Sequence, residues 1–137
     1  MTAKLQTAVL GATGYAGFEL ARILLRHPQL KKPIFYVREQ GAGGDLAEAY
    51  PPLAGNGGYA LEPFSWESLK QHGVGLLFLA TPHEASRSLA PEAEARGIRV
   101  VDLSGAWRLR DAENRAVYAF HDADPIAAAE FTARAVY

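Results

Sequence analysis

The chain has 137 residues, of which 49% are hydrophobic and 21% charged, and its formal net charge at pH 7 is -1. This balance is typical of a folded globular protein and gives no sign of a nucleic-acid or membrane-surface partner. No apolar run approaches the roughly 20 residues of a membrane span, and the first residues lack the apolar core of a secretory signal. We therefore expect a cytoplasmic protein with a single domain over residues 1–137.

A glycine-rich turn near the N-terminus is the most informative stretch. The apolar run 5–10 ends at Gly11, and Gly14 and Gly17 follow at intervals of three residues before an apolar helical pattern. This order of strand, tight turn and helix is typical of a dinucleotide-binding βαβ unit. Gly11 would allow the sharp turn, Gly14 the close approach of a pyrophosphate, and Gly17 tight packing of the helix on the strand. The N–H groups that begin the helix would then bind the anion.

Helices and strands alternate along the rest of the chain. Apolar periodicity predicts two longer helices, over 18–26 and 84–96, the second with a kink or a restart at Pro91. Apolar and β-branched runs predict further strands, over 34–37, 74–80 and 98–103. Weaker signals predict a helix over 65–71 capped by Ser65, a short helix over 125–130, and an irregular segment over 45–63 with a possible strand near 59–61.

This alternation predicts an α/β fold with a doubly wound, mostly parallel Rossmann-type sheet and helices on both faces. Ligands of such sheets bind at the carboxyl ends of the strands. Four segments are expected at that edge: 11–17, Arg38, 81–83 and 104–108. The residues that we expect to contact the cofactor are Gly11, Thr13, Gly14, Tyr15, Ala16, Gly17, Arg38, Thr81, Pro82 and His83.

The end of the second strand indicates which dinucleotide is bound. In NAD-binding members of this fold an acidic residue about 20 positions after the glycines binds the ribose 2′-hydroxyl. Here Arg38 stands at that position, with Glu39 beside it. A guanidinium suits a 2′-phosphate, so NADP is favoured, although Arg38 as a solvated strand-end residue and partial NAD binding through Glu39 stay open.

Polar residues also follow the last two predicted strands. His83 begins a helix and is equally compatible with a ligand contact or a structural role. Ser104 and Arg108 follow the strand over 98–103, where the guanidinium of Arg108 could hold a phosphate or carboxylate through two parallel hydrogen bonds. A surface ion pair is the alternative for Arg108. We expect no metal site, and the absence of cysteine excludes disulfides and thiol nucleophiles within these 137 residues.

Four stretches together resemble the N-terminal half of the N-acetyl-gamma-glutamyl-phosphate reductases, a family that belongs with the semialdehyde dehydrogenases. They are Gly-Ala-Thr-Gly-Tyr-Ala-Gly (11–17), Arg-His-Pro (26–28), Ala-Thr-Pro-His (80–83) and Asp-Leu-Ser-Gly-Ala-Trp-Arg-Leu-Arg-Asp (102–111). The resemblance extends from Ala8 to Tyr137, and Ala-Val-Tyr (135–137) is similar to the start of the family's next block.

The resemblance implies an activity, and it implies that cofactor binding and the covalent step are carried out by different parts of the enzyme. The family reduces N-acetyl-glutamyl phosphate to the semialdehyde with NADPH in arginine biosynthesis, through a cysteine thiolate that attacks the acyl phosphate and a thioester that hydride reduces. By resemblance, Ser104 and Arg108 would bind the substrate phosphate, and the full-length enzyme is expected to be a homo-oligomer. The family's cysteine and histidine base lie further along the chain. We therefore expect this sequence to be a cofactor-binding fragment that is inactive alone.

Two other functions stay open. An extended short-chain reductase or sugar-nucleotide epimerase would need a tyrosine four residues before a lysine, and none of the four lysines has one. A non-catalytic dinucleotide-binding module is compatible with the missing nucleophile but leaves Ser104 and Arg108 unexplained. A P-loop nucleotidase is excluded because no Gly-Lys-Ser/Thr follows the glycines.

Overall fold

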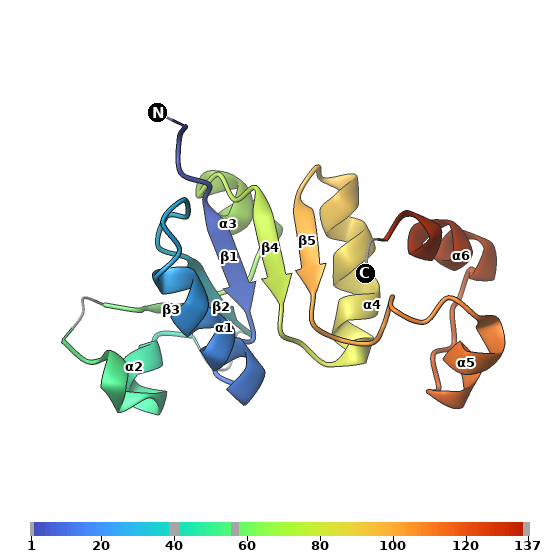
Figure 1. Cartoon of the computed structure of the whole chain (residues 1–137), viewed down its shortest axis with the longest axis horizontal. Coiled ribbons are helices and arrows are strands. Elements are labelled where there is room, and N and C mark those ends of the chain that lie inside the picture. Colours follow the sequence, from blue (N-terminus) through green and yellow to red (C-terminus); the bar gives the residue numbers. More distant parts are fainter. Residues whose placement is uncertain (1, 39–41, 56–57, 136–137) are drawn as a thin grey trace.

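The computed structural model describes residues 2–38, 42–55 and 58–135. Its strands are β1 Thr7–Leu10, β2 Ile34–Val37, β3 Leu61–Pro63, β4 Leu76–Leu79 and β5 Arg99–Asp102. They form one sheet in the order β3-β2-β1-β4-β5, and every neighbouring pair is parallel (Figure 1). The predicted α/β, doubly wound Rossmann-type fold is therefore confirmed. Because the strands are parallel, their carboxyl ends all lie at the same edge of the sheet.

Helices connect the strands. They are α1 Tyr15–Leu25, α2 Leu46–Ala49, α3 Trp66–Gln71, α4 His83–Ala95, α5 Ala112–Val117 and α6 Pro125–Arg134, with a short 3-10 helix, η2, over Pro51–Leu53. The predicted cap of α3 is confirmed, since the Ser65 hydroxyl accepts a hydrogen bond of 3.1 Å from the N–H of Ser68. Among the helices of the described residues, none combines the length and apolar character needed to cross a lipid bilayer.

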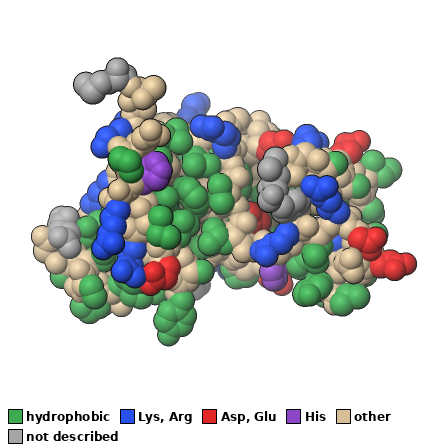
Figure 2. All heavy atoms as spheres, in the orientation of Figure 1, with side chains coloured by type: hydrophobic (Ala, Val, Ile, Leu, Met, Phe, Trp, Pro, Cys, Tyr) green, Lys and Arg blue, Asp and Glu red, His purple; other side chains and the backbone are tan. Residues whose placement is uncertain are grey.

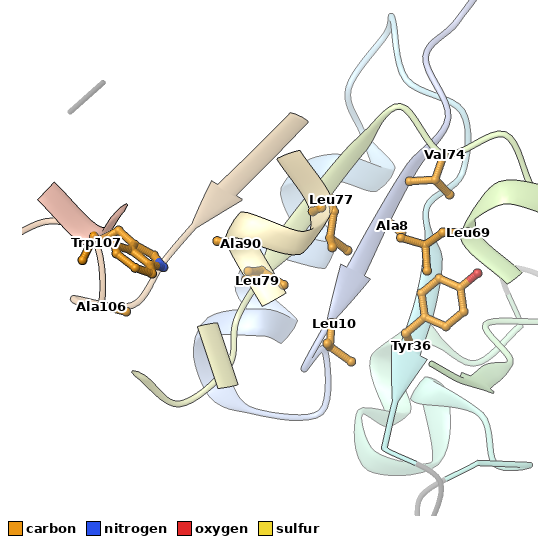
Figure 3. Packing of buried hydrophobic residues seen from close by; sticks show 12 residues of the cluster. Ala8, Leu10, Tyr36, Leu69, Val74, Leu77, Leu79, Ala90, Ala106 and Trp107 are labelled. Atoms are coloured by element: carbon orange, nitrogen blue, oxygen red, sulfur yellow. The ribbon is translucent and has the colours of Figure 1, made fainter. Parts of the chain in front are cut away.

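Alternate residues of the strands face opposite sides of the sheet and build two cores. On one side Ala8, Leu77 and Leu79 pack with residues of α3 and α4, as Figure 3 shows for this cluster. On the other side Val9 and Phe78 pack with residues of α1 and α2. Continuous apolar runs were the sequence signal for these strands because both faces are covered.

At Pro91 of α4 the sequence predicted a kink or a restart of the helix. The chain does not restart there, and one helix runs through the proline from His83 to Ala95. Proline removes one helical hydrogen bond. Ala90 and Ala93, which flank it, are buried against the rest of the core and retain the helix through packing. Tertiary packing here outweighs the local preference of the proline.

The segment 45–63 is more ordered than predicted. Asp45 caps α2 through a complete capping box: its carboxylate accepts from the N–H of Ala47 at 2.8 Å, and Glu48 accepts from the N–H of Asp45 at 3.3 Å. The predicted strand near 59–61 is β3, shifted to Leu61–Pro63. Residues 56–57 of this segment lie outside the described residues. So do Glu39 and its neighbours 40–41, which precede the segment.

Two helices follow β5. The structure adds α5, which the sequence did not predict, and extends the predicted helix over 125–130 to α6, Pro125–Arg134. Figure 1 shows both beyond α4, at the β5 end of the molecule. Side chains of both charge signs are spread around hydrophobic ones on the face in Figure 2, which agrees with the small net charge.

Leu77 provides a test of the core that supports the strand ends. Its side chain is fully buried in the central part of the sheet, so we expect Leu77→Ala to lower the free energy of unfolding by about 3 kcal/mol, measured by urea denaturation. The control is Val117→Ala, where the side chain is 81% exposed and little should change. Equal losses for the two variants would contradict this assignment of the core.

Candidate functional site

Two glycines of the turn after β1 are required by packing inside the chain itself. Gly11 has a φ of +95°, and a Cβ there would overlap the carbonyl group of Ala80. A Cβ on Gly17 would overlap the carbonyl oxygen of Gly11 and lie 2.9 Å from the Cα of Ala12. Helix α1 therefore begins in direct backbone contact with the turn, as the sequence predicted for these two positions.

Gly14 differs from its two neighbours in the motif. Its φ and ψ are -80° and 166°, which any residue adopts. A Cβ there would meet only the carbonyl oxygen of Gly11, at an ordinary distance of 3.7 Å. The fold therefore leaves room for a side chain at Gly14, and what a glycine contributes there is close access from outside.

The residues around Gly14 present the start of α1 to solvent. Thr13, Tyr15 and Ala16 are exposed, and the side chain of Tyr15 is 91% exposed. The first N–H groups of a helix have no partner within it, and with the helix dipole they favour an anion. The turn thus offers donors and positive potential beside a position without a side chain.

A groove of about 600 Å³ begins at this turn. Of the residues predicted to bind a cofactor, it brings together Gly11, Thr13, Arg38, Thr81 and Pro82. These come from the carboxyl ends of β1, β2 and β4, so three of the four predicted segments meet in one cavity. Apolar side chains of Leu10, Val37, Phe64 and Leu89 complete its wall.

His83 is not among the residues that line this groove. Its Nδ1 accepts a hydrogen bond of 3.0 Å from the N–H of Gly105, and its ring lies 5.2 Å from that of Phe120. This imidazole therefore connects the first turn of α4 to the loop after β5.

Asp102 and Ser86 also connect the loop before α4 with the loop after β5, through side-chain hydrogen bonds. The Ser86 hydroxyl, fully buried, lies 2.8 Å from the Thr81 hydroxyl and donates to Asp102 at 3.0 Å. Asp102 also accepts from the N–H and the hydroxyl of Ser104, at 2.8 and 3.0 Å. Because the hydroxyl hydrogen of Ser104 is directed to Asp102, its oxygen faces the loop as an acceptor, and the N–H of Ala106 donates to it at 3.1 Å.

Arg108 lies in a second groove, of about 600 Å³, on the far side of β5. This groove is lined by Ser104 and Arg108 together with Arg99, Trp107 and Phe131. The exposed guanidinium of Arg108 donates to the carbonyl oxygens of Leu103 and Ser104, at 3.3 and 3.1 Å. The two predicted sets of residues thus line separate grooves, which the hydrogen bonds of Ser86 and Asp102 connect.

Comparison with known proteins gives the family. The family model described as "Semialdehyde dehydrogenase, NAD binding domain" matches residues 6–135. The chain belongs to this family. An N-acetyl-gamma-glutamyl-phosphate reductase from Pectobacterium carotovorum subsp. carotovorum (strain PC1) is 40% identical over 136 residues, which cover 97% of this chain and 40% of that relative. The chain therefore spans less than half the length of this curated relative.

Solved structures agree on the fold. A probable aspartate-semialdehyde dehydrogenase from Pseudomonas aeruginosa is 30% identical, with a TM-score of 0.60 over 88% of this chain and 36% of that one. The aspartate semialdehyde dehydrogenase with NADP from Candida albicans has a TM-score of 0.64 at 18% identity, over 78% of this chain and 31% of that one. At that identity the second likeness is evidence for the fold alone.

In this semialdehyde dehydrogenase domain, a buried arginine that the sequence did not single out fixes the loop after β5. Arg115 of α5 is 4% exposed and forms two hydrogen bonds of 2.8 Å with the carboxylate of Asp122. It also donates to the carbonyl oxygens of Ala106 and Leu109, at 2.5 and 3.0 Å, on either side of Arg108. A seven-residue spacing across a turn carries no periodic signal, so only the fold reveals this pair.

The Arg115 guanidinium holds the pKa of the Asp122 carboxyl below its ordinary value, chiefly through hydrogen bonds. Partial burial of Asp122 opposes this shift, while the charges of Arg115 and Arg87 add to it. A depressed pKa means that ionised Asp122 stabilises the folded state at neutral pH and that this stabilisation is lost as the pH falls through the pKa of the folded state.

The glycine turn generates one prediction. We expect Gly17→Ala to lower the free energy of unfolding by about 3 kcal/mol, because its Cβ would meet backbone that cannot move aside. Gly14→Ala should unfold close to the temperature of the unsubstituted chain, since its Cβ meets only an ordinary contact. Thermal unfolding measures both. A large loss at Gly14 would show that the fold itself demands that glycine.

The Asp122 carboxylate generates a second prediction. Asp122→Asn should lower the free energy of unfolding at pH 7 by about 2 kcal/mol, because it leaves part of the buried Arg115 without its partner. This difference should begin to shrink as the pH falls below about 4, the ordinary pKa of an aspartate, and should disappear only below the lowered pKa of Asp122 in the folded state. Urea denaturation across this range measures it.

The matched control for Asp122 is Glu92→Gln, which removes an exposed ion pair with Arg96 and should change little at either pH. A difference for Asp122→Asn that stayed constant from pH 7 to the acid range would contradict the role assigned to its ionised form.

Proposed function

We propose that this chain is the cofactor-binding portion of an N-acetyl-gamma-glutamyl-phosphate reductase and that its cofactor is NADP(H). The family assignment and the 40% identity to a reductase of that name over nearly the whole chain support the proposal. The catalysed reaction would be reduction of N-acetyl-glutamyl phosphate to the semialdehyde, and bound NADPH would supply the hydride.

The observation that most supports a cofactor site is the difference in packing between Gly14 and the other two glycines of the motif. Internal packing accounts for Gly11 and Gly17, whereas it leaves the space at Gly14 open. A pyrophosphate against the N–H groups that begin α1 would use this space, since any side chain at residue 14 would stand between the anion and the backbone. The residues present therefore fit a dinucleotide.

Arg38 supports NADP over NAD. It is exposed at the end of β2 and lines the same groove as Gly11 and Thr13, so its guanidinium is available to a 2′-phosphate through two parallel hydrogen bonds. The Candida albicans aspartate semialdehyde dehydrogenase of similar fold was solved with NADP. Glu39, the residue that could favour NAD, lies outside the described residues.

The groove beyond β5 would receive the phosphate of the substrate. Arg108 is exposed there, and its guanidinium donates to the backbone carbonyl oxygens of Leu103 and Ser104. A phosphate can replace these with stronger charge-assisted hydrogen bonds. Ser104 would contribute its hydroxyl only by giving up its bond to Asp102. We therefore assign Arg108 the larger share of phosphate binding.

The reaction also needs a nucleophile that this chain does not contain. Attack on an acyl phosphate by a thiolate requires a cysteine, and the 137 residues hold none. In the proposed enzyme this chain binds the cofactor and orients the substrate phosphate, while the covalent step takes place on a cysteine outside these residues.

Calorimetric titration of Arg38→Ala tests the cofactor. We expect the unsubstituted chain to bind NADPH more tightly than NADH, and Arg38→Ala to weaken NADPH about tenfold or more while NADH changes little, because only NADPH carries the 2′-phosphate.

The control is Gly14→Val, which keeps Arg38 but fills the space at the turn, so it should abolish binding of both cofactors alike. Equal losses of NADPH and NADH affinity in Arg38→Ala would contradict the role of Arg38. Unchanged binding in Gly14→Val would mean that the glycines only form a turn.

A further inference from the structure

Tyr50, in the segment after β2, contacts the glycine turn. Its hydroxyl donates a hydrogen bond of 2.9 Å to the carbonyl oxygen of Thr13. Its ring stacks on that of Phe18 in the first turns of α1, with centroids 3.5 Å apart and planes 6° from parallel. Tyr50 is separated from Thr13 by 37 residues of sequence, so this contact is made by the fold and not by local chain geometry.

Short-range bonds fix the position of Tyr50. Its N–H donates to the carbonyl oxygen of Leu46 at 3.0 Å, which ends α2, and its own carbonyl oxygen accepts from Leu53 of η2 at 3.0 Å. Asp45 anchors this unit to the residues just before β3 by accepting from the N–H of Tyr59 at 2.7 Å. The ring of Tyr50 is thus carried by a capped helix that is itself tied to the sheet.

The contact fixes one peptide group of the turn at both ends. The carbonyl oxygen of Thr13 is held by Tyr50, and the N–H of the same peptide, on Gly14, donates to Gly11 at 3.3 Å. This is the peptide that precedes the position left open for close approach. A carbonyl that could rotate here would turn its negative end toward an approaching phosphate, whereas the hydroxyl of Tyr50 holds it in place.

Packing of the segment does not require this hydroxyl. Leu46, Leu53 and Tyr59 are buried and supply the apolar contacts that hold the segment on the sheet. Tyr50 is partly exposed, and water could satisfy the carbonyl oxygen of Thr13 equally well. What the hydroxyl adds is orientation of the turn.

We propose that Tyr50 is a positioning residue for the pyrophosphate part of the cofactor site and that α2 and η2 hold it in place. The proposal rests on the proposed function, since it assigns a task at the same site. Tyr50 does not act on the cofactor itself: it holds the Thr13–Gly14 peptide so that the N–H groups at the start of α1 meet the phosphates without prior reorganisation.

The variant Tyr50→Phe tests the proposal because it removes one oxygen and keeps the ring that stacks on Phe18. Two ligands separate the parts of the site: NADPH carries the pyrophosphate, whereas adenosine 2′-monophosphate carries the 2′-phosphate and neither phosphate of the pyrophosphate. We expect calorimetry on the whole chain to give a Kd for NADPH about three- to tenfold higher, with the Kd for the monophosphate unchanged.

Tyr118→Phe is the matched control, an exposed tyrosine in the loop after α5, and it should bind both ligands as the unsubstituted chain does. A general loosening of the fold by Tyr50→Phe would weaken both ligands together, and that result would overturn the proposal, as would unchanged affinity for NADPH. If the unsubstituted chain bound neither NADPH nor NADH, the proposed function itself would fail, and the role of Tyr50 with it.

Discussion

The contact between the start of α1 and the carbonyl group of Gly11 determines most of the cofactor side of this molecule. It sets how closely the helix approaches the strand, and it exists only because residue 17 has no Cβ. The positive φ of Gly11 brings the chain into that contact at the carboxyl end of β1, directly beside the end of β4 at Ala80. The first turn of the helix, with its unpaired N–H groups, is thereby aimed at the edge where parallel sheets bind ligands.

The loops after β4 and β5 behave as one structural unit although they line different grooves. Ser86 and Asp102 connect them through a buried chain of hydrogen bonds, and the indole N–H of Trp107 donates to the carbonyl oxygen of Ser86 at 3.2 Å. Arg115 then holds the far end of the second loop through its backbone carbonyls. Such a satisfied polar network gives a loop a defined shape without regular secondary structure.

Much of the architecture could be predicted because its signals are local. Apolar runs indicated β1, β2 and β4, which are covered on both faces, and also the edge strand β5, which is partly exposed, and glycine spacing indicated the turn. Two features were not anticipated in this form. Pro91 remains inside α4 because neighbouring alanines are buried, and α2 forms from only four residues because Asp45 and Glu48 complete a capping box. That Asp-x-x-Glu spacing was a signal available in the sequence.

The residues of the candidate site and its supports divide in the same way. Gly11, Arg38 and Thr81 lie at strand ends, where chain order alone predicts that they meet. Arg115, Asp122 and Tyr50 act through partners that only folding brings together. Arg115 and Tyr50 donate to backbone carbonyls, which sequence does not distinguish, and Asp122 accepts from Arg115. The family resemblance implied that Ser104 binds the substrate phosphate, and in the structure its hydroxyl donates to Asp102.

The position of β1 in the sheet has a consequence for how the chain acquires its structure. β1 pairs on one side with β2, with Ala8 opposite Ile34, and on the other with β4, with Thr7 opposite Leu76. During synthesis from the N-terminus, the edge of β1 that pairs with β4 stays unpaired until β4 has been synthesised. Folding therefore depends on contacts between distant parts of the sequence, which slows it and exposes the strand to association with other chains until the sheet closes.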